Sequence, residues 1–174
     1  MVGAGQGKFG LEKIMVQQST QPRALRSDAG KLPIAVTRTT KPKPRPADGD
    51  LQFGNVFTDH MFVADYTEGQ GWHDARVVPY QPFSLDPATA VLHYAQAVFD
   101  GLKAFRGADG NIRLFRAPKH IERLGRSCER LCIPALDPDF VLDSFHKLVG
   151  IDHAWVPKKV GTSLYMRPTV IASE

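Results

Sequence analysis

Two hydrophobic patterns alternate along the chain, and the first is typical of strands. Residues 56–66 show no helical period and are rich in aromatic and β-branched residues, which predicts a strand. A turn at residues 67–71 and a second strand at residues 75–83 follow, and this strand is bent at Pro79 and Pro82. The regular part of the chain therefore begins as β-structure.

Further strands are predicted in the middle and at the end of the chain. The loop sequence Gly107-Ala108-Asp109-Gly110-Asn111 separates two short apolar runs, residues 102–106 and 112–116, which predicts a hairpin. Residues 162–172 are again strand-like. We expect regular structure to begin near Gln52.

The second pattern, apolar residues three and four positions apart, predicts three helices. The first begins at Asp86-Pro87 and ends at Gly101, because an acidic cap, an early proline and a terminal glycine are favoured there. The second begins at Pro118, and the third runs from Asp137-Pro138 to Gly150. The apolar positions that define them are Val91, Leu92, Ala95, Val98 and Phe99, then Ile121, Leu124, Cys128 and Leu131, then Phe140, Val141, Phe145, Leu148 and Val149. Strands mixed with helices predict an α+β fold, with helices packed on a mostly antiparallel sheet.

Charge divides the chain into two parts. Its 174 residues are 43% hydrophobic and 23% charged, as in an ordinary globular protein. Residues 1–50 hold nine Lys and Arg against four Asp and Glu, whereas residues 51–174 hold thirteen against fourteen. We therefore expect residues 1–50 to be a basic, Pro-rich, flexible segment and residues 51–174 to be a small α+β domain.

The basic segment does not predict nucleic-acid binding. Its run Lys41-Pro42-Lys43-Pro44-Arg45-Pro46 is typical of an extended, charged linker, and no aromatic residues are interleaved with the basic ones to stack on bases. No stretch of eighteen apolar residues is present, so we expect no membrane-spanning helix. The cytoplasm is the expected compartment, with mitochondria as the alternative if the basic segment is a leader.

The second predicted helix carries side chains that could bind an anion or a metal ion. Arg123, Arg126 and Arg130 follow at i, i+3 and i+7 and so project from one side, either as a solvated outer face or as an anion site. Cys128 and Cys132 lie one turn apart, but no further Cys and no pair of His at ligand spacing accompanies them. We expect both cysteines to pack in the interior, and no metal site.

Five stretches, in this order, change the interpretation. They are FGNVFTDHM (53–61), LHYAQAVFDGLKAFRG (92–107), RLFR (113–116), IERLGRSCERLCIP (121–134) and SLYMRP (163–168). Together they resemble the N-terminal part of a branched-chain aminotransferase, a pyridoxal-phosphate enzyme of fold type IV. The resemblance covers about residues 50–174.

The resemblance assigns roles to six residues. Arg123 matches the arginine that holds the cofactor phosphate, whereas Arg126 and Arg130 match nothing and stay surface charge. Residues that match the wall of the pocket for the substrate side chain are Phe57, Tyr94 and Phe99. Tyr165 and Arg167 match a pair near the substrate, where the arginine can bind the distal carboxylate of glutamate.

The same resemblance implies the reaction and its partners. It implies amino transfer between leucine, isoleucine or valine and 2-oxoglutarate, with pyridoxal 5'-phosphate as cofactor, in a homodimeric enzyme of branched-chain amino-acid biosynthesis. The lysine that forms the Schiff base would lie beyond residue 174, so no catalytic residue is expected in this chain and we expect it not to transaminate by itself. The alternatives are a related enzyme, such as a D-amino-acid aminotransferase or an aminodeoxychorismate lyase, and a non-catalytic self-associating domain.

Overall fold

A computed structural model of the chain describes residues 32–47, 50–51 and 53–173. Its elements are β1 (Ala35–Val36), β2 (His60–Thr67), β3 (Gly71–Pro79), α1 (Ala90–Tyr94), β4 (Ala97–Phe99), β5 (Leu102–Arg106), β6 (Ile112–Leu114), α2 (Ala117–Arg130), α3 (Pro138–Ile151), the 3₁₀ turn η1 (His153–Trp155), β7 (Leu164–Met166) and β8 (Thr169–Ile171).

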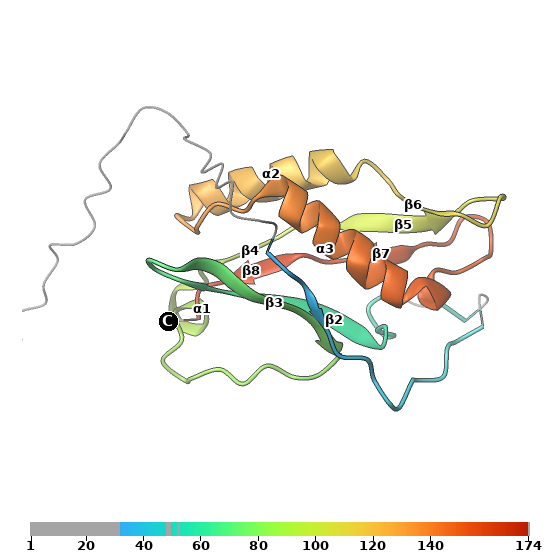
Figure 1. Ribbon diagram of the computed structural model, residues 1–174, viewed down its shortest axis with the longest axis horizontal. Helices are drawn as coiled ribbons and strands as arrows, with labels where there is room; N and C mark the ends of the chain where they lie inside the picture. The colour runs from blue at the N-terminus through green and yellow to red at the C-terminus, as the bar shows by residue number, and fades with distance from the viewer. Residues whose placement is uncertain (1–31, 48–49, 52, 174) are drawn as a thin grey trace, which may run out of the picture. The chain divides into compact units, whose positions relative to one another are not determined.

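The strands form three small sheets (Figure 1). Their strand orders are β1-β3-β2, β4-β8 and β6-β5-β7, and every pair is antiparallel except β1 with β3. The main core lies where α2 and α3 pack on β5 and β7. Its buried members include Leu102 and Ala104 of β5, Ile121 of α2 and Phe145 of α3. The predicted α+β class, with helices on mostly antiparallel strands, is confirmed.

The two long helices begin and bury their apolar faces as predicted. Asp137 caps α3 by accepting a hydrogen bond from the Phe140 N–H at 2.8 Å, and prolines stand in the first turns of both helices. Leu124 and Cys128 of α2 are fully buried. Leu131 was expected on this face, but α2 ends at Arg130 and the Leu131 side chain is partly exposed, so that expectation is wrong.

The first predicted helix is much shorter than its pattern suggests. Within the predicted helix of residues 86–101, only α1 is helical. Ala95, which follows α1, has a left-handed backbone conformation with φ of 53°. Val98 and Phe99 lie in β4, which pairs with β8, so the prediction of a helix extending to Gly101 is wrong. The strand forms because it buries Val98 against Leu124 and Cys128 in the second core cluster.

The remaining strands are shifted from their predicted limits. The β2–β3 hairpin turns at residues 68–70, so β2 ends at Thr67 and β3 begins at Gly71. Strand β3 ends at Pro79, whose missing N–H cannot continue a ladder. The predicted hairpin around residues 107–111 is confirmed as β5 and β6. The final strand-like segment is divided into β7 and β8 at Arg167-Pro168.

Regular structure begins earlier than expected. Strand β1 pairs with β3 through Ala35 opposite Arg76 and Val36 opposite Val77, so the predicted start near Gln52 is too late. The described residues, 32–47, 50–51 and 53–173, belong to one compact unit. Residues 1–31, the first part of the segment expected to be flexible, lie outside the described residues. Every helix in the described ranges is too short or too polar to cross a bilayer.

Candidate functional site

The arginine singled out by the sequence is held by a buried carboxylate. Arg123 on α2 donates two parallel hydrogen bonds to Asp100, from Nε to Oδ2 and from Nη2 to Oδ1, each 2.6 Å long. The Asp100 side chain is 3% exposed and also accepts the Gly101 N–H at 2.6 Å. His120 Nδ1 lies 3.2 Å from Asp100 Oδ1 and 3.1 Å from Arg123 Nη2. Asp100 therefore fixes the orientation of the Arg123 guanidinium.

The electrostatics of this cluster keep both partners charged at neutral pH. Burial raises the pKa of Asp100, but hydrogen bonds from Arg123, the Gly101 N–H and His120 outweigh burial, so the pKa lies below that of an ordinary aspartate. The hydrogen bonds to Asp100 and the negative charge of that carboxylate raise the pKa of Arg123. The pair is a fixed dipole whose cationic end is the accessible one, because the Arg123 side chain is 56% exposed.

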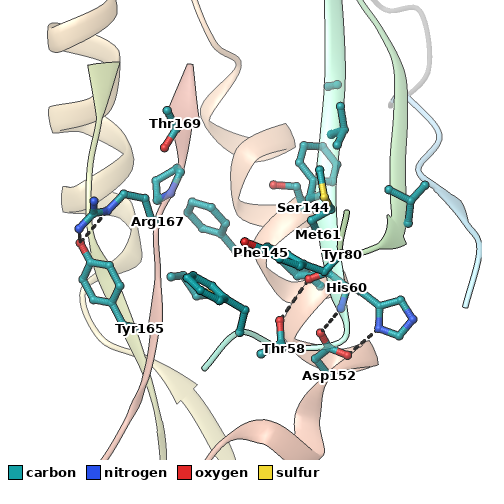
Figure 2. A pocket seen from close by; sticks show the side chains of 18 of the residues that line it. Thr58, His60, Met61, Tyr80, Ser144, Phe145, Asp152, Tyr165, Arg167 and Thr169 are labelled. Carbon is teal, nitrogen blue, oxygen red and sulfur yellow. Dashed lines mark hydrogen bonds and ion pairs between the residues drawn. The ribbon is translucent and has the colours of Figure 1, made fainter. Parts of the chain in front are cut away.

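Tyr165, Arg167 and Phe99 form a second cluster. Figure 2 shows the Arg167 guanidinium against the Tyr165 hydroxyl. Arg167 donates to the Tyr165 hydroxyl from Nε at 3.3 Å and from Nη2 at 3.1 Å. Its guanidinium carbon also lies 4.7 Å from the centre of the Phe99 ring. The Tyr165 ring covers Gly101, where an added Cβ would overlap it. Because Gly101 follows Asp100 in the chain, the two clusters are contiguous.

Phe57 belongs to a third group of side chains. Its ring stacks on Tyr80, with 5.2 Å between the ring centres and 10° between the planes. Phe57, Tyr165 and Arg167 all line one groove of about 1940 Å³, which also borders β2 and α3. Phe53, at the start of the same loop, meets the Tyr165 ring edge-on at 5.1 Å. The groove therefore joins the Phe57 loop to the Tyr165–Arg167 cluster.

The structure brings five of the six candidates into this neighbourhood and leaves one apart. Arg123, Asp100 and Phe99 do not line the groove; Phe99 contacts it through Arg167, and Arg123 is linked to it because its partner Asp100 precedes Gly101, which the Tyr165 ring covers. Tyr94 is 83% exposed at the end of α1, and the only ring beside its own among the described residues is that of His93.

The remaining charges of α2 behave as surface. Arg126 pairs with Glu122 at 2.8 Å on the exposed side of the helix.

The prediction that both cysteines pack in the interior is right for Cys128, which is fully buried, and wrong for Cys132, which is exposed. Within the described residues, no group of three or more His, Cys, Asp or Glu side chains could hold a metal ion.

Sequence reasoning missed Asp100 and His120. The helical pattern predicts Asp100 near the end of a helix, where an acidic residue has no evident role, and Asp100 lies 23 positions before Arg123. The spacing of His120 and Arg123, three residues apart on one helix, was the available signal that the two side chains share a face.

Arg123 can hold an anion in one particular way. The two nitrogens of its fork already bind Asp100, whereas Nη1 makes no hydrogen bond to any described residue. An external phosphate would therefore meet the Nη1 edge of an arginine whose orientation is already fixed, rather than the open fork that the sequence suggested. The residues present fit the phosphate of pyridoxal phosphate on these terms.

Similarity to known proteins is high along most of the chain. It is 53% identical over 141 residues to branched-chain-amino-acid aminotransferase 2 of Bacillus subtilis and 42% identical over 146 residues to the mitochondrial branched-chain-amino-acid aminotransferase of Bos taurus. These matches cover 81% and 84% of this chain. The chain belongs to the branched-chain aminotransferase family. Its expected resemblance to that family is confirmed.

The chain is shorter than these relatives. It spans 38% of the Bacillus subtilis protein and 37% of the Bos taurus protein. No family model matches the sequence. Among solved structures, Escherichia coli branched-chain amino acid aminotransferase aligns with 56% of this chain and 30% of its own, at 20% identity and a TM-score of 0.47, a likeness too weak to support any argument.

Proposed function

We propose that this chain supplies part of the active site of a branched-chain aminotransferase, which moves an amino group between leucine, isoleucine or valine and 2-oxoglutarate. The observation that carries the proposal is the Arg123 guanidinium, fixed by buried Asp100 with its Nη1 edge open. The family membership of the chain supports the same reaction. Pyridoxal 5'-phosphate, when bound, would supply the electron sink that this chemistry needs.

In this proposal Arg123 binds the cofactor phosphate. A guanidinium held by a carboxylate does not have to be ordered again when an anion arrives, so less conformational entropy is lost on binding. His120 lies against the same pair, and a proton on its ring would add to the positive field. The Schiff-base lysine is not assigned to any residue of this chain.

The aromatic and cationic residues of the groove would bind the substrate side chain. Phe57 offers an apolar ring for a branched side chain, whose burial is favourable by about 25 cal/mol per Å². Arg167, held by the Tyr165 hydroxyl and the face of Phe99, would bind the distal carboxylate of glutamate or 2-oxoglutarate. An apolar wall beside a cation lets one site accept both substrates in turn.

Two further expectations belong to the same proposal. Tyr94 and Phe99 are among the most exposed aromatic side chains, and we place them at a surface covered by a second copy of the polypeptide in a homodimer. Size-exclusion chromatography with light scattering measures that state. We place the enzyme in the cytoplasm, although the relatives include a protein named as mitochondrial.

A hybrid polypeptide tests the proposal. In it, the matched residues of the Bacillus subtilis aminotransferase are replaced by those of this chain, so that the relative supplies the rest. We expect this hybrid to transfer the amino group of leucine to 2-oxoglutarate, the Arg123→Gln hybrid to lose most of that activity, and the 174-residue chain alone to show none. A folded hybrid without activity, or activity that survives Arg123→Gln, contradicts the proposal.

A further inference from the structure

The Lys–Pro run, which the sequence predicts to be an extended linker, is bound to the folded unit. We call residues 37–45 the strap. Its anchoring hydrogen bonds run from Thr37 N–H to Val77 O at 2.9 Å, from Thr39 N–H to His60 Nε2 at 2.9 Å and from Arg45 Nη1 to Ala154 O at 2.7 Å. The strap therefore runs from β3 past the start of β2 to the 3₁₀ turn η1.

The prolines explain how the strap presents its basic residues. Pro42, Pro44 and Pro46 favour an extended backbone and remove N–H groups that would otherwise need partners. Lys43 and Arg45 both donate side-chain hydrogen bonds to the folded unit, so both side chains face it.

Lys43 holds the chain immediately before β2. Its backbone N–H donates to Asp59 Oδ1 at 2.8 Å, and its Nζ donates to the carbonyl oxygens of Phe57 at 3.2 Å and Thr58 at 2.8 Å. Trp155 Nε1 binds the other oxygen of Asp59 at 2.9 Å. Burial raises the pKa of Asp59, but these hydrogen bonds outweigh burial and hold its pKa below the ordinary value, so the carboxylate stays ionised as their acceptor.

The same ammonium group also contacts the aromatic partner of Phe57. Lys43 Nζ lies 4.6 Å from the centre of the Tyr80 ring, and Phe57 stacks on that ring. Lys43 thus binds both the backbone of Phe57 and the ring against which the Phe57 side chain rests. Phe57 is 49% exposed, so burial alone does not fix its position.

We propose that Lys43 is a positioning residue for Phe57: through the Phe57 and Thr58 carbonyls and the Tyr80 ring, it sets where the Phe57 side chain stands in the groove. The consequence for substrate selection rests on the proposed function, in which Phe57 lines the pocket for the branched side chain. The placement of Phe57 itself does not depend on that function.

Nuclear magnetic resonance of the isotope-labelled 174-residue chain, without cofactor or substrate, tests the placement. Lys43→Met keeps the apolar stem and removes the donors, Lys43→Arg keeps donors and charge, and Lys41→Met is the matched control. The Lys41 side chain makes no hydrogen bond or ion pair to the residues that the structure describes. Ring-to-ring nuclear Overhauser effects between Phe57 and Tyr80 report the stack, and urea unfolding reports global stability.

The proposal expects three results. In the wild-type chain the ε-methylene protons of Lys43 are shifted upfield by the Tyr80 ring. The Phe57–Tyr80 effects fall at least about threefold in Lys43→Met, remain in Lys41→Met and return in Lys43→Arg. The urea midpoint of Lys43→Met stays close to that of Lys41→Met. If Lys43 only stabilised the fold as a whole, the midpoint of Lys43→Met would fall.

Either of two results overturns it. One is the absence of the upfield shift in the wild-type chain, which would show that Lys43 is not over Tyr80. The other is a Lys43→Met chain whose Phe57 signals and ring contacts equal those of Lys41→Met. Since no cofactor or substrate is present, a negative result here is distinct from inactivity of the hybrid enzyme.

Discussion

Replacing Asp152 by alanine removes both acceptors of a buried histidine. Asp152 Oδ1 lies 2.7 Å from His60 Nδ1, and Oδ2 accepts the His60 backbone N–H at 3.0 Å. The two side chains are 3% and 6% exposed. His60 Nε2 accepts the Thr39 N–H, so the imidazole proton must be on Nδ1 and the ring has a defined hydrogen-bonding role at each nitrogen.

The loss in the free energy of unfolding follows from the two donors of His60 that Asp152→Ala leaves without partners. A buried donor that loses its acceptor costs about 1–3 kcal/mol, so two of them cost about 2–6 kcal/mol, with a central value near 4. For a folded unit of this size that corresponds to a fall of roughly 10 °C in the unfolding midpoint. Asp152→Asn keeps one acceptor oxygen, and we expect a smaller loss than for the alanine variant.

The assay is urea unfolding at pH 7, followed by circular dichroism, with Asp109→Ala as the matched control. Asp109 accepts two hydrogen bonds from Arg113, of 2.9 and 2.5 Å, as short as those of Asp152. That pair is exposed, and water replaces either partner. Asp109 also accepts hydrogen bonds from Asn111 in the exposed β5–β6 turn. We therefore expect a clear loss for Asp152→Ala and a much smaller loss for Asp109→Ala. Equal effects of the two substitutions would refute the reasoning that burial, rather than bond length, decides the cost.

Three further predictions concern the site and its surroundings. Gly101→Ala would push a methyl group into the Tyr165 ring, so we expect a changed Tyr165 environment in the near-ultraviolet circular dichroism spectrum with retained secondary structure. Iodoacetamide should label exposed Cys132 in the native chain and reach Cys128 only after unfolding, because Cys128 is fully buried and burial raises the pKa of its thiol; peptide mass spectrometry checks this. The lowered pKa of Asp100 means that its ionised form stabilises the fold above the ordinary carboxyl pKa of about 3.9 and that this stabilisation is lost as the pH falls through the lower folded value. The stability difference between the wild-type chain and Asp100→Asn should therefore be full at pH 6 and shrink below about pH 4 in urea titrations.

The elements that sequence predicts well have local causes. The hairpin of β5 and β6 follows from the Asp109-Gly110 turn, and the start of α3 follows from the Asp137 cap. In each case the residues that determine the structure lie within a few positions of one another. Such signals do not depend on the rest of the fold.

The elements that sequence predicts poorly are decided by distant partners. Val98 fits a helical spacing, but it forms β4 because β8 pairs with it more than seventy positions later. The sequence places Lys43 in an extended linker, because nothing near Lys43 in the sequence shows that the Phe57 and Thr58 carbonyls accept its hydrogen bonds. Tertiary pairing overrides local pattern in both cases.

The candidate site likewise combines features that the sequence indicates with features that only the structure shows. Its residues came from the family resemblance, and their grouping came from the structure. No spacing in the sequence indicates that Asp100 occupies the fork of Arg123, since the pair joins the end of β4 to the middle of α2. The resemblance supplied the role of Arg123, and the structure supplied the reason why its orientation is fixed.

The affinity of the hybrid aminotransferase for pyridoxal phosphate, measured by equilibrium dialysis with absorbance detection, shows whether Arg123 holds the cofactor phosphate. Arg126→Gln is the matched control, because Arg126 lies one turn from Arg123 and pairs only with exposed Glu122 among the residues that the structure describes. We expect Arg123→Gln to weaken binding about 10- to 100-fold and Arg126→Gln to leave it unchanged. Equal losses in the two variants, or no loss in Arg123→Gln, would contradict the assignment of the phosphate to Arg123.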